Sequence, residues 1–423
     1  MTSLLELQTI QTGGPAWLGQ MRREAYGRFA ELGFPTTKDE EWKYTNVGPI
    51  AKTRFERGPA GAARAGKDLL PDLGCSTRLV FVNGILAPEL STPGTVVRGV
   101  AVRSLGEALK ADGGAVEAHL GRYARTERQA FTALNTALWE DGAIVEIGRN
   151  AVPGQPIHLV FLSAGNGQPW ASHPRVLILA ERGSQAAVIE HYTGAAGSRY
   201  FTNAVTEIVL GEGAILDHYR IQDESEGAYH IATVQGVQGR NSVLRSHNAV
   251  LGAALSRNDI NSALNGEGAE CTLNGLFLVT GERHADIHTL LDHAKPHCGS
   301  RELYKGILDG RGVGVFNGKI VVRPDAQKTN AIQSNRNLLL SADAVINTKP
   351  QLEIFADDVR CTHGATVGQI DSEALFYMQS RGIPGAEARD ILTLAFASEV
   401  LDEMGWEPAR ERLRREAHEI LSR

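Results

Sequence analysis

The fold is decided by residues 203–241, NAVTEIVLGEGAILDHYRIQDESEGAYHIATVQGVQGRN, where short apolar runs alternate with turns. The runs NAVTEIVL, ILDHYRI and ATVQGVQ are rich in valine, isoleucine, threonine and tyrosine, which favour β-strands. The clusters at 211–213 (GEG) and 239–241 (GRN) supply the residues that tight turns require. Helical periodicity is weak throughout. The stretch therefore predicts consecutive strands joined by tight turns.

The same pattern extends from about Ala143 to about Gln369. Neighbouring turn clusters are mostly about 30 residues apart, which is solenoid spacing. The interval between Gly268 and Gly310 is longer, so one coil is either enlarged or poorly marked. The turn clusters are 183–184, 211–213, 239–241, 266–268, 310–312 and 341–343.

Two β architectures compete for this segment, a two-sheet sandwich and a parallel β-solenoid. A sandwich of this length would exceed the usual size of a single core, whereas a solenoid grows by stacking coils. We therefore predict a mainly β fold with a β-solenoid over 143–370. A helical domain with a short strand precedes it at 1–142, and a helical domain follows at 371–423. These helices are expected to cap the two ends of the solenoid.

The predicted helix after Pro384 carries two apolar stripes, which indicates two packing partners. One partner is expected to be the body of this chain and the other a second protein, the alternative being a fully buried helix. We assign the first stripe to partner binding. It consists of Leu392, Phe396, Val400 and Met404, and the second of Ile391, Leu394, Ala395 and Leu401.

Composition excludes several function classes. The chain has 423 residues with 43 Lys plus Arg against 49 Asp plus Glu, a net charge of −6 that argues against nucleic-acid and anionic-membrane binding. It contains no apolar run of about 18 residues that would span a membrane. The start, without Lys or Arg before Arg22 and without an apolar core, does not fit a signal peptide, so a cytoplasmic location is expected. The four scattered cysteines are expected to be reduced.

Nucleotide-binding and hydrolytic motifs are missing. The stretch GRGVGVFNGKI at 310–320 has Val313 where a phosphate-binding loop needs glycine, and Ile320 where it needs serine or threonine. No G-x-S-x-G or H-E-x-x-H pattern occurs. We therefore expect no catalytic residue in this chain.

A histidine-rich stretch, ERHADIHTLLDHAKPHCGS at 282–300, is a first candidate site. On a helix, the pairs His284/His288 and His293/His297 would each face one way and suit a metal. On strands, positions four apart lie roughly 13 Å from each other. The β context favours hydrogen-bonded packing between coils, with metal binding as the alternative.

The second candidate is the pair Cys361 and His363 in EIFADDVRCTHGATVGQ. An extended backbone puts residues i and i+2 on the same face, so thiol and imidazole point to one surface. They are ligands that suit iron, zinc or copper, but two ligands are too few for a stable site. Either they are packed residues or a partner completes the site. Asp357 and Asp358 either support the ligands or are turn residues.

The segments LLDHAKPHCGSRELYKGIL (290–308) and GVFNGKIVVRPDAQKTNAIQ (314–333), with further matching residues to Leu401 and EEWKYTNV at 40–47, carry a family resemblance. The sequence resembles the SufB/SufD family of iron-sulfur cluster assembly proteins. It is more similar to the SufD member, because it has VRCTHGAT at 359–366 and lacks the N-terminal cysteine cluster and late cysteine of SufB.

The resemblance implies a right-handed parallel β-helix between helical domains, and a scaffold role in a complex with SufB and the ABC-type ATPase SufC. In the family, SufB and SufD pair through late β-helix strands, and SufC docks on the C-terminal helices. The interface histidine falls on His363, with Cys361 beside it. A transient iron-sulfur cluster in the complex and no stable cofactor in the isolated chain are then expected, and a homodimer of the isolated chain stays open. Cys75, Cys271 and Cys298 are expected to be structural.

The rival hypothesis is a β-helix enzyme that acts on polysaccharides. Glycosidic chemistry needs paired acidic residues on one face. Asp357 and Asp358 are expected to alternate across a strand, which disfavours the rival.

Overall fold

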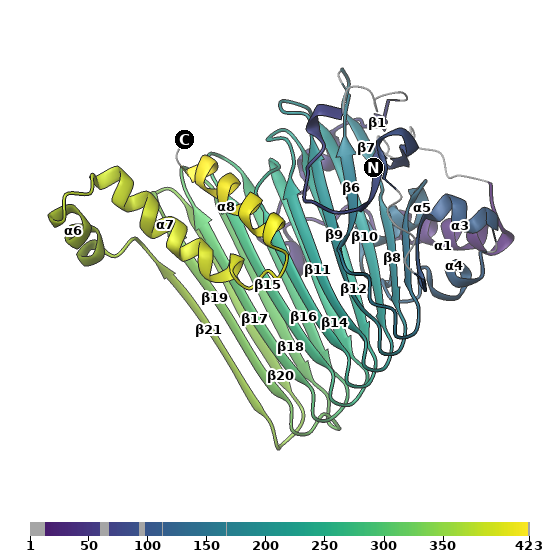
Figure 1. The fold of residues 1–423 in the computed structure, drawn as a ribbon. Coiled ribbons are helices and arrows are strands. Elements are labelled where there is room, and N and C mark those ends of the chain that lie inside the picture. Colours follow the sequence, from purple (N-terminus) through teal and green to yellow (C-terminus); the bar gives the residue numbers. More distant parts are fainter. Residues whose placement is uncertain (1–12, 60–66, 93–97, 112, 166, 422–423) are drawn as a thin grey trace.

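The computed structural model describes residues 13–59, 67–92, 98–111, 113–165 and 167–421. Residues 1–12, which bear on the signal-peptide expectation, lie outside these ranges. Two long sheets run along the molecule, and two series of corners connect the strands of one sheet to those of the other. Helices lie at the N-terminal end and along one face (Figure 1). The parallel β-solenoid predicted from the turn spacing is thus confirmed.

Each sheet is built from alternate strands of the chain, because every coil contributes one strand to each. Sheet A contains β4 (Val100–Ser104), β5 (Gly142–Ile147), β8 (Arg175–Ala180), β10 (Tyr200–Leu210), β12 (Tyr229–Gln238), β14 (Leu255–Leu264), β16 (His284–His293), β18 (Val313–Val322) and β20 (Val345–Ile354), with β1 (Glu56–Arg57) and β7 (Trp170–Ser172) beside this path. Sheet B contains β3 (Ile85–Leu86), β2 (Thr77–Val82), β6 (Ile157–Ser163), β9 (Gln185–Gly194), β11 (Ile215–Asp223), β13 (Val243–Val250), β15 (Glu270–Val279), β17 (Gly299–Leu308), β19 (Asn330–Leu339) and β21 (Arg360–Gly368).

The coils repeat in parallel register. Leu255 pairs with His284, and His284 with Val313, so two successive coils advance along the chain by the same step. No coil is enlarged between Gly268 and Gly310: the corner at 294–298 has the sequence AKPHC and simply lacks glycine. Gly268 marks a corner that leads from sheet A to sheet B, whereas Gly310 marks a corner that leads from sheet B back to sheet A. The interval between these two glycines is therefore longer than one coil.

One series of corners holds a left-handed residue in each coil except the last. These residues have φ between +52° and +70°. Each donates its backbone N–H to a carbonyl in the corner of the next coil, at 2.6–3.2 Å. Glycine and asparagine tolerate this conformation best, which explains their recurrence in the sequence. The positions are Asn150, Gly183, Gly213, Asn241, Gly268, His297 and Lys328.

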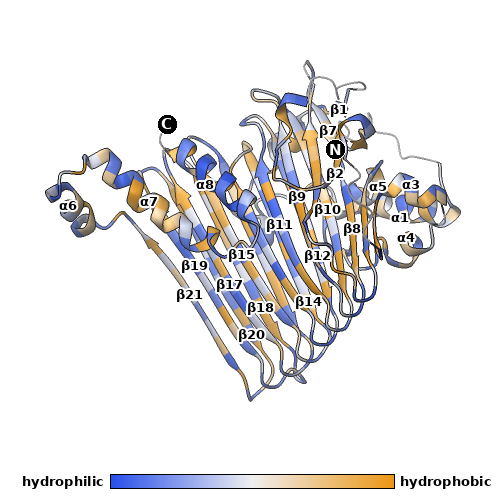
Figure 2. Ribbon diagram, in the orientation of Figure 1, coloured by the Kyte–Doolittle hydropathy of each residue, from blue (hydrophilic) through white to orange (hydrophobic). Residues whose placement is uncertain are grey.

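Inward-pointing side chains of the two sheets form one continuous core along the solenoid axis. In β15, Cys271, Leu273 and Phe277 are buried there, at 0–2% exposure. Successive side chains of a strand point in turn to the lumen and to the outer surface. Apolar and polar segments accordingly alternate along the strands in Figure 2. Cys271 and Cys298 are both buried and free in this core, and Cys75 is half-buried.

The N-terminal helices cover the outer face of sheet A. Phe29 of α1 and Phe131 of α5 pack with the outward residues Phe201 and Ile231. At the N-terminal end, β4 pairs antiparallel with β5, which closes that edge. The helices and 3-10 turns are α1 (Ala16–Leu32), η1 (Glu40–Trp42), α2 (Gly48–Lys52), η3 (Pro88–Leu90), α3 (Leu105–Ala111), α4 (Gly114–His119) and α5 (Ala130–Leu138).

The C-terminal helices do not cap the solenoid, contrary to the expectation from sequence. α7 (Gly385–Leu401) and α8 (Glu407–Leu421) lie on the outer face of sheet B, where Tyr219, Leu276 and Ile307 receive their apolar side chains. α6 (Ser372–Ser380) stands beside them near the end of β21 (Figure 1). No helix in the described part of the chain is long and apolar enough to cross a membrane.

We expect Gly213→Ala to destabilise the protein by about 1–2 kcal/mol, because an L-residue is strained at φ +66° although a Cβ there meets nothing within 4 Å. Gly364→Ala is the matched control, since its Cβ also meets nothing within 4 Å and its φ is not positive. Urea-unfolding midpoints of the two variants test this. Equal midpoints would show that the left-handed corner is not under strain.

Candidate functional site

The C-terminal end of the solenoid is open. β20 and β21 are the edge strands of their sheets, with no described strand beyond them (Figure 1). Large apolar side chains are exposed along this end: Val345 is 48% exposed, Phe355 60% and Val367 48%. Exposed edge strands are rarely left bare in native proteins, because unpaired N–H and C=O groups attract other strands. This end is therefore the strongest candidate for an interaction surface.

Cys361 and His363 lie on β21 at this open end. Their register partners on β19 are Ala331 and Gln333, both buried residues of the lumen side. The two side chains therefore share the lumen-side face. His363 is exposed because no coil follows, whereas Cys361 is half-buried against the core. Burial raises the pKa of the Cys361 thiol, which disfavours its thiolate, so His363 is the more accessible side chain of the two.

Two further polar residues stand behind His363 in the lumen, and sequence reasoning did not single them out. Glu302 of β17 and Gln333 of β19 occupy successive register positions that lead to His363. Both are 1% exposed, and Gln333 Nε2 donates to Glu302 Oε2. Burial raises the pKa of Glu302 to about 7. One signal in the sequence could have found them: Glu302, Gln333 and His363 are separated from one another by the length of one coil.

The pair does not make a metal site by itself. Among the described residues, no three His, Cys, Asp or Glu side chains come together to hold a metal ion. A cluster at this position would need ligands from outside the chain.

The four histidines of the 282–300 stretch are dispersed rather than gathered. His284 bonds with Thr45 Oγ1 on the outer face at 2.9 Å, and His293 bonds with Ser300 Oγ in the lumen at 2.9 Å. His297 occupies a left-handed corner. Their positions fit the hydrogen-bonded packing that we favoured from the sequence.

His288 belongs to a buried ionic cluster that fastens the 40–46 segment to sheet A. Its Nε2 lies 3.0 Å from Asp286 Oδ1, and Arg257 contacts Asp286 and stacks 3.8 Å over the Trp42 ring. Burial opposes the charged imidazole, but the charge of Asp286 and the hydrogen bonds to Asp286 and Glu41 together outweigh this and raise the pKa of His288 to about 9. This explains why EEWKYT carries mixed charges around its aromatic residues.

The predicted partner-binding stripe needs correction. Val400 and Met404 are each 3% exposed, because they pack on the outer face of sheet B. Leu392 and Phe396 are half-buried, and Lys305 Nζ donates to the Phe396 carbonyl at 2.9 Å. Phe396, Val400 and Met404 thus attach α7 to its own solenoid. The free apolar surface lies nearby on α6 and the start of α7, at Phe376 (72% exposed), Tyr377 (59%) and Ile391 (41%).

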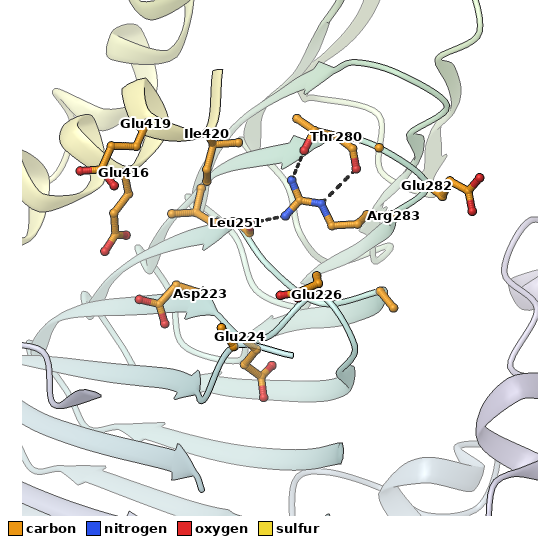
Figure 3. A pocket seen from close by; sticks show the side chains of 13 residues that line it. Asp223, Glu224, Glu226, Leu251, Thr280, Glu282, Arg283, Glu416, Glu419 and Ile420 are labelled. Atoms are coloured by element: carbon orange, nitrogen blue, oxygen red, sulfur yellow. Dashed lines mark hydrogen bonds between the residues drawn. The ribbon is translucent and has the colours of Figure 1, made fainter. Parts of the chain in front are cut away.

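A cavity of about 890 Å³ lies between α8 and the corners of sheet B (Figure 3). Carboxylates dominate its wall: Asp223, Glu224, Glu226, Glu282, Glu416 and Glu419. Asp223 is paired with two residues that lie outside the lining. His191 Nε2 lies 3.1 Å and Arg412 3.0 Å from Asp223 Oδ2, and Arg283 donates to the Leu251 carbonyl at 2.7 Å. The ion pair of Arg412 with Asp223 therefore fastens α8 to the end of β11 beside this cavity.

The rival polysaccharide enzyme gains no support. We expected Asp357 and Asp358 to alternate across a strand, and this was wrong. Both residues lie in the corner between β20 and β21. Asp358 forms an ion pair with Lys328, and its backbone carbonyl accepts the Lys328 N–H at 2.6 Å. These carboxylates complete the last corner and form no catalytic pair.

Fold and site together define a β-solenoid protein whose last coil is uncovered and carries Cys361 and His363 on one face. Residues 161–396 match the family described as SUF system FeS cluster assembly, SufBD core domain, and residues 5–159 match the SufBD protein N-terminal region. The chain belongs to the SufBD family. This family consists of assembly proteins, and the chain acts in SUF iron-sulfur cluster assembly.

Relatives agree with this assignment. An iron-sulfur cluster assembly SufBD family protein of Synechocystis is 36% identical over 93% of this chain and 89% of its own length. The iron-sulfur cluster assembly protein SufD of Escherichia coli is 34% identical over 88% of this chain and 85% of its own. SufD of Bacillus subtilis is 26% identical over 94% and 93%. The predicted likeness to SufD is thereby confirmed.

We expect Glu416→Gln to stabilise the protein at pH 8 and to leave its stability unchanged near pH 4. Burial and the charge of Asp223 raise the pKa of Glu416 to about 7. Because this folded-state pKa lies above the unfolded value, the ionised carboxylate costs stability from about pH 4.5 upward and fully above about pH 7, by roughly 1–3 kcal/mol. Urea midpoints against pH measure it, with the exposed Glu419→Gln as control. A pH-independent difference would contradict the argument.

Proposed function

We propose that this chain is a non-catalytic scaffold subunit that pairs with SufB and the ATPase SufC and holds a nascent iron-sulfur cluster only within that complex. The observation that carries the proposal is the uncovered last coil, where His363 faces an open lumen between two bare strand edges. A solenoid needs something to cover such an end. A second solenoid of the same family offers matching edges.

The proposed SufB interface consists of β20, β21 and the exposed apolar residues beside them. Val345, Ile354, Phe355 and Val367 are 40–60% exposed there. Pairing of edge strands between two subunits would satisfy the free backbone groups of β20 and β21, and apolar contacts would add affinity. In the absence of SufB, the same surface favours a homodimer of the isolated chain.

The cluster is the cargo of this interface. An imidazole nitrogen of His363 is a suitable iron ligand, and SufB would complete the set with thiolate or carboxylate ligands. Cys361 lies on the same face of β21 but is half-buried, so it has a supporting role. We propose that the isolated chain holds no stable cluster, in keeping with its incomplete ligand set.

The proposed SufC surface lies on α6 and the start of α7. Phe376 and Tyr377 are more than half exposed on a helix whose side chains are nowhere fully buried. The sequence has no phosphate-binding loop, so ATP would have to be hydrolysed by a partner. Aromatic side chains of this kind often carry the binding energy of an interface.

We expect His363→Ala to leave folding and SufB pairing intact and to lower the cluster content of the assembled complex on the order of tenfold. The exposed position of His363 makes the substitution structurally mild. Iron and sulfide analysis of the co-purified complex measures the effect. Cys361→Ser is expected to retain most of the cluster. Full cluster content in His363→Ala would remove His363 from the ligand set.

We expect Phe376→Glu to weaken SufC binding by about tenfold, equivalent to ~1.4 kcal/mol, without loss of stability. Val152→Glu is the control, since Val152 is 56% exposed but lies between β5 and β6, far along the chain. Titration calorimetry with purified SufC gives the affinities. Equal affinity of the Phe376 variant and the parent would place the SufC surface elsewhere.

A further inference from the structure

Glu302, Gln333 and His363 form a file of lumen-side residues that ends at the open coil. They come from β17, β19 and β21 and are direct register neighbours. Adjacent strands lie about 4.8 Å apart, so the side chains of neighbouring positions on one face are within reach of each other. The inference drawn from this file rests on the proposed role of His363 as an iron ligand.

The Gln333 amide is held in one orientation. Its Nε2 donates to Glu302 Oε2, so its oxygen points away from that bond. Gln333 Oε1 is buried and has no hydrogen-bond partner among the described residues. A buried acceptor without a partner costs about 1–3 kcal/mol, so native structures seldom leave one unused. The next polar group in the file is the His363 ring.

The opposite sheet leaves room for this amide. Gly318 of β18 faces Gln333 across the lumen, and a Cβ at Gly318 would lie 2.4 Å from Gln333 Nε2 and 2.8 Å from its Cδ. Such contacts would force the amide to move. Glycine at this position therefore permits the conformation in which Gln333 bonds to Glu302.

We propose that Gln333 is a positioning residue whose Oε1 accepts the ring N–H of His363, fixing the imidazole tautomer so that its other nitrogen is free to bind iron. Glu302 anchors the amide from behind. Metal-binding histidines commonly donate their second ring N–H to a fixed acceptor, which sets ring orientation and strengthens the ligand. Here the acceptor is supplied by the preceding coil, before any partner subunit is present.

The test reads the tautomer directly in the isolated full-length chain. Nitrogen-15 chemical shifts of labelled histidines report which ring nitrogen carries the proton, at about pH 8.5 where an ordinary imidazole is neutral. His363→Ala identifies the signal. We expect one tautomer in the parent, and a mixture in Gln333→Met. Gly318→Ala should shift the ratio in the same direction, because its Cβ displaces the Gln333 amide.

Gln222→Met is the matched control. Gln222 is also buried in the lumen, donates Nε2 to a buried glutamate, Glu224, at 3.1 Å, and has an unpartnered Oε1, but it lies on β11, five coils from His363. It should leave the His363 signal unchanged. An unchanged tautomer in Gln333→Met, or an equal change in Gln222→Met, would overturn the proposal.

Cluster content in the SufB and SufC complex separates this inference from the proposed function. We expect Gln333→Met to lower cluster content on the order of tenfold. If His363→Ala loses the cluster while Gln333→Met keeps both tautomer and cluster, the positioning role is wrong and the ligand stands. If His363→Ala assembles a full cluster, the proposed function fails, and an altered tautomer in Gln333→Met would then establish only the hydrogen bond.

Discussion

The backbone ladder along one series of corners is the constraint on which the rest of the structure depends. One left-handed residue per coil donates its N–H to the next corner, from Asn150 to Lys328, and this fixes the stacking distance of every coil. Within each sheet, neighbouring strands then pair in parallel register without slippage. Because the register is fixed, residues far apart in the sequence are brought into files along the lumen, and the file that ends at His363 is one of them.

The same constraint gives the two ends of the molecule different characters. At the N-terminal end, β4 turns antiparallel and covers the edge of sheet A. At the other end the C-terminal helices fold back onto sheet B, so the coil that bears β20 and β21 is left bare. The ion pair between Arg412 and Asp223 holds α8 in this arrangement, and the interaction surfaces that we propose lie on the parts that remain exposed.

Much of the fold could be predicted from the sequence, because glycine and asparagine mark the left-handed corners at Gly183, Gly213, Asn241 and Gly268. His297 and Lys328 occupy the same position without any sequence signal, so these two corners were missed, and the corner at Asn150 was not marked either. Parity along β21 was enough to place Cys361 and His363 on one face. Glu302 and Gln333 were missed because their pairing with β21 depends on the exact length of each coil, which varies along the chain. On α7, residues of both apolar stripes, such as Val400 and Leu401, pack on the solenoid, so the assignment of one whole stripe to a partner was wrong.

Coil length varies while strand length does not. The strands from β14 to β20 are all equally long, yet the step between register partners is shorter from Leu255 to His284 than from Val313 to Val345. The difference is taken up entirely in the corners. Insertions are therefore tolerated in the corners and excluded from the strands. A relative that lacked one whole coil would lose one residue from every lumen file, and the residues at the open end would shift by one coil along the axis.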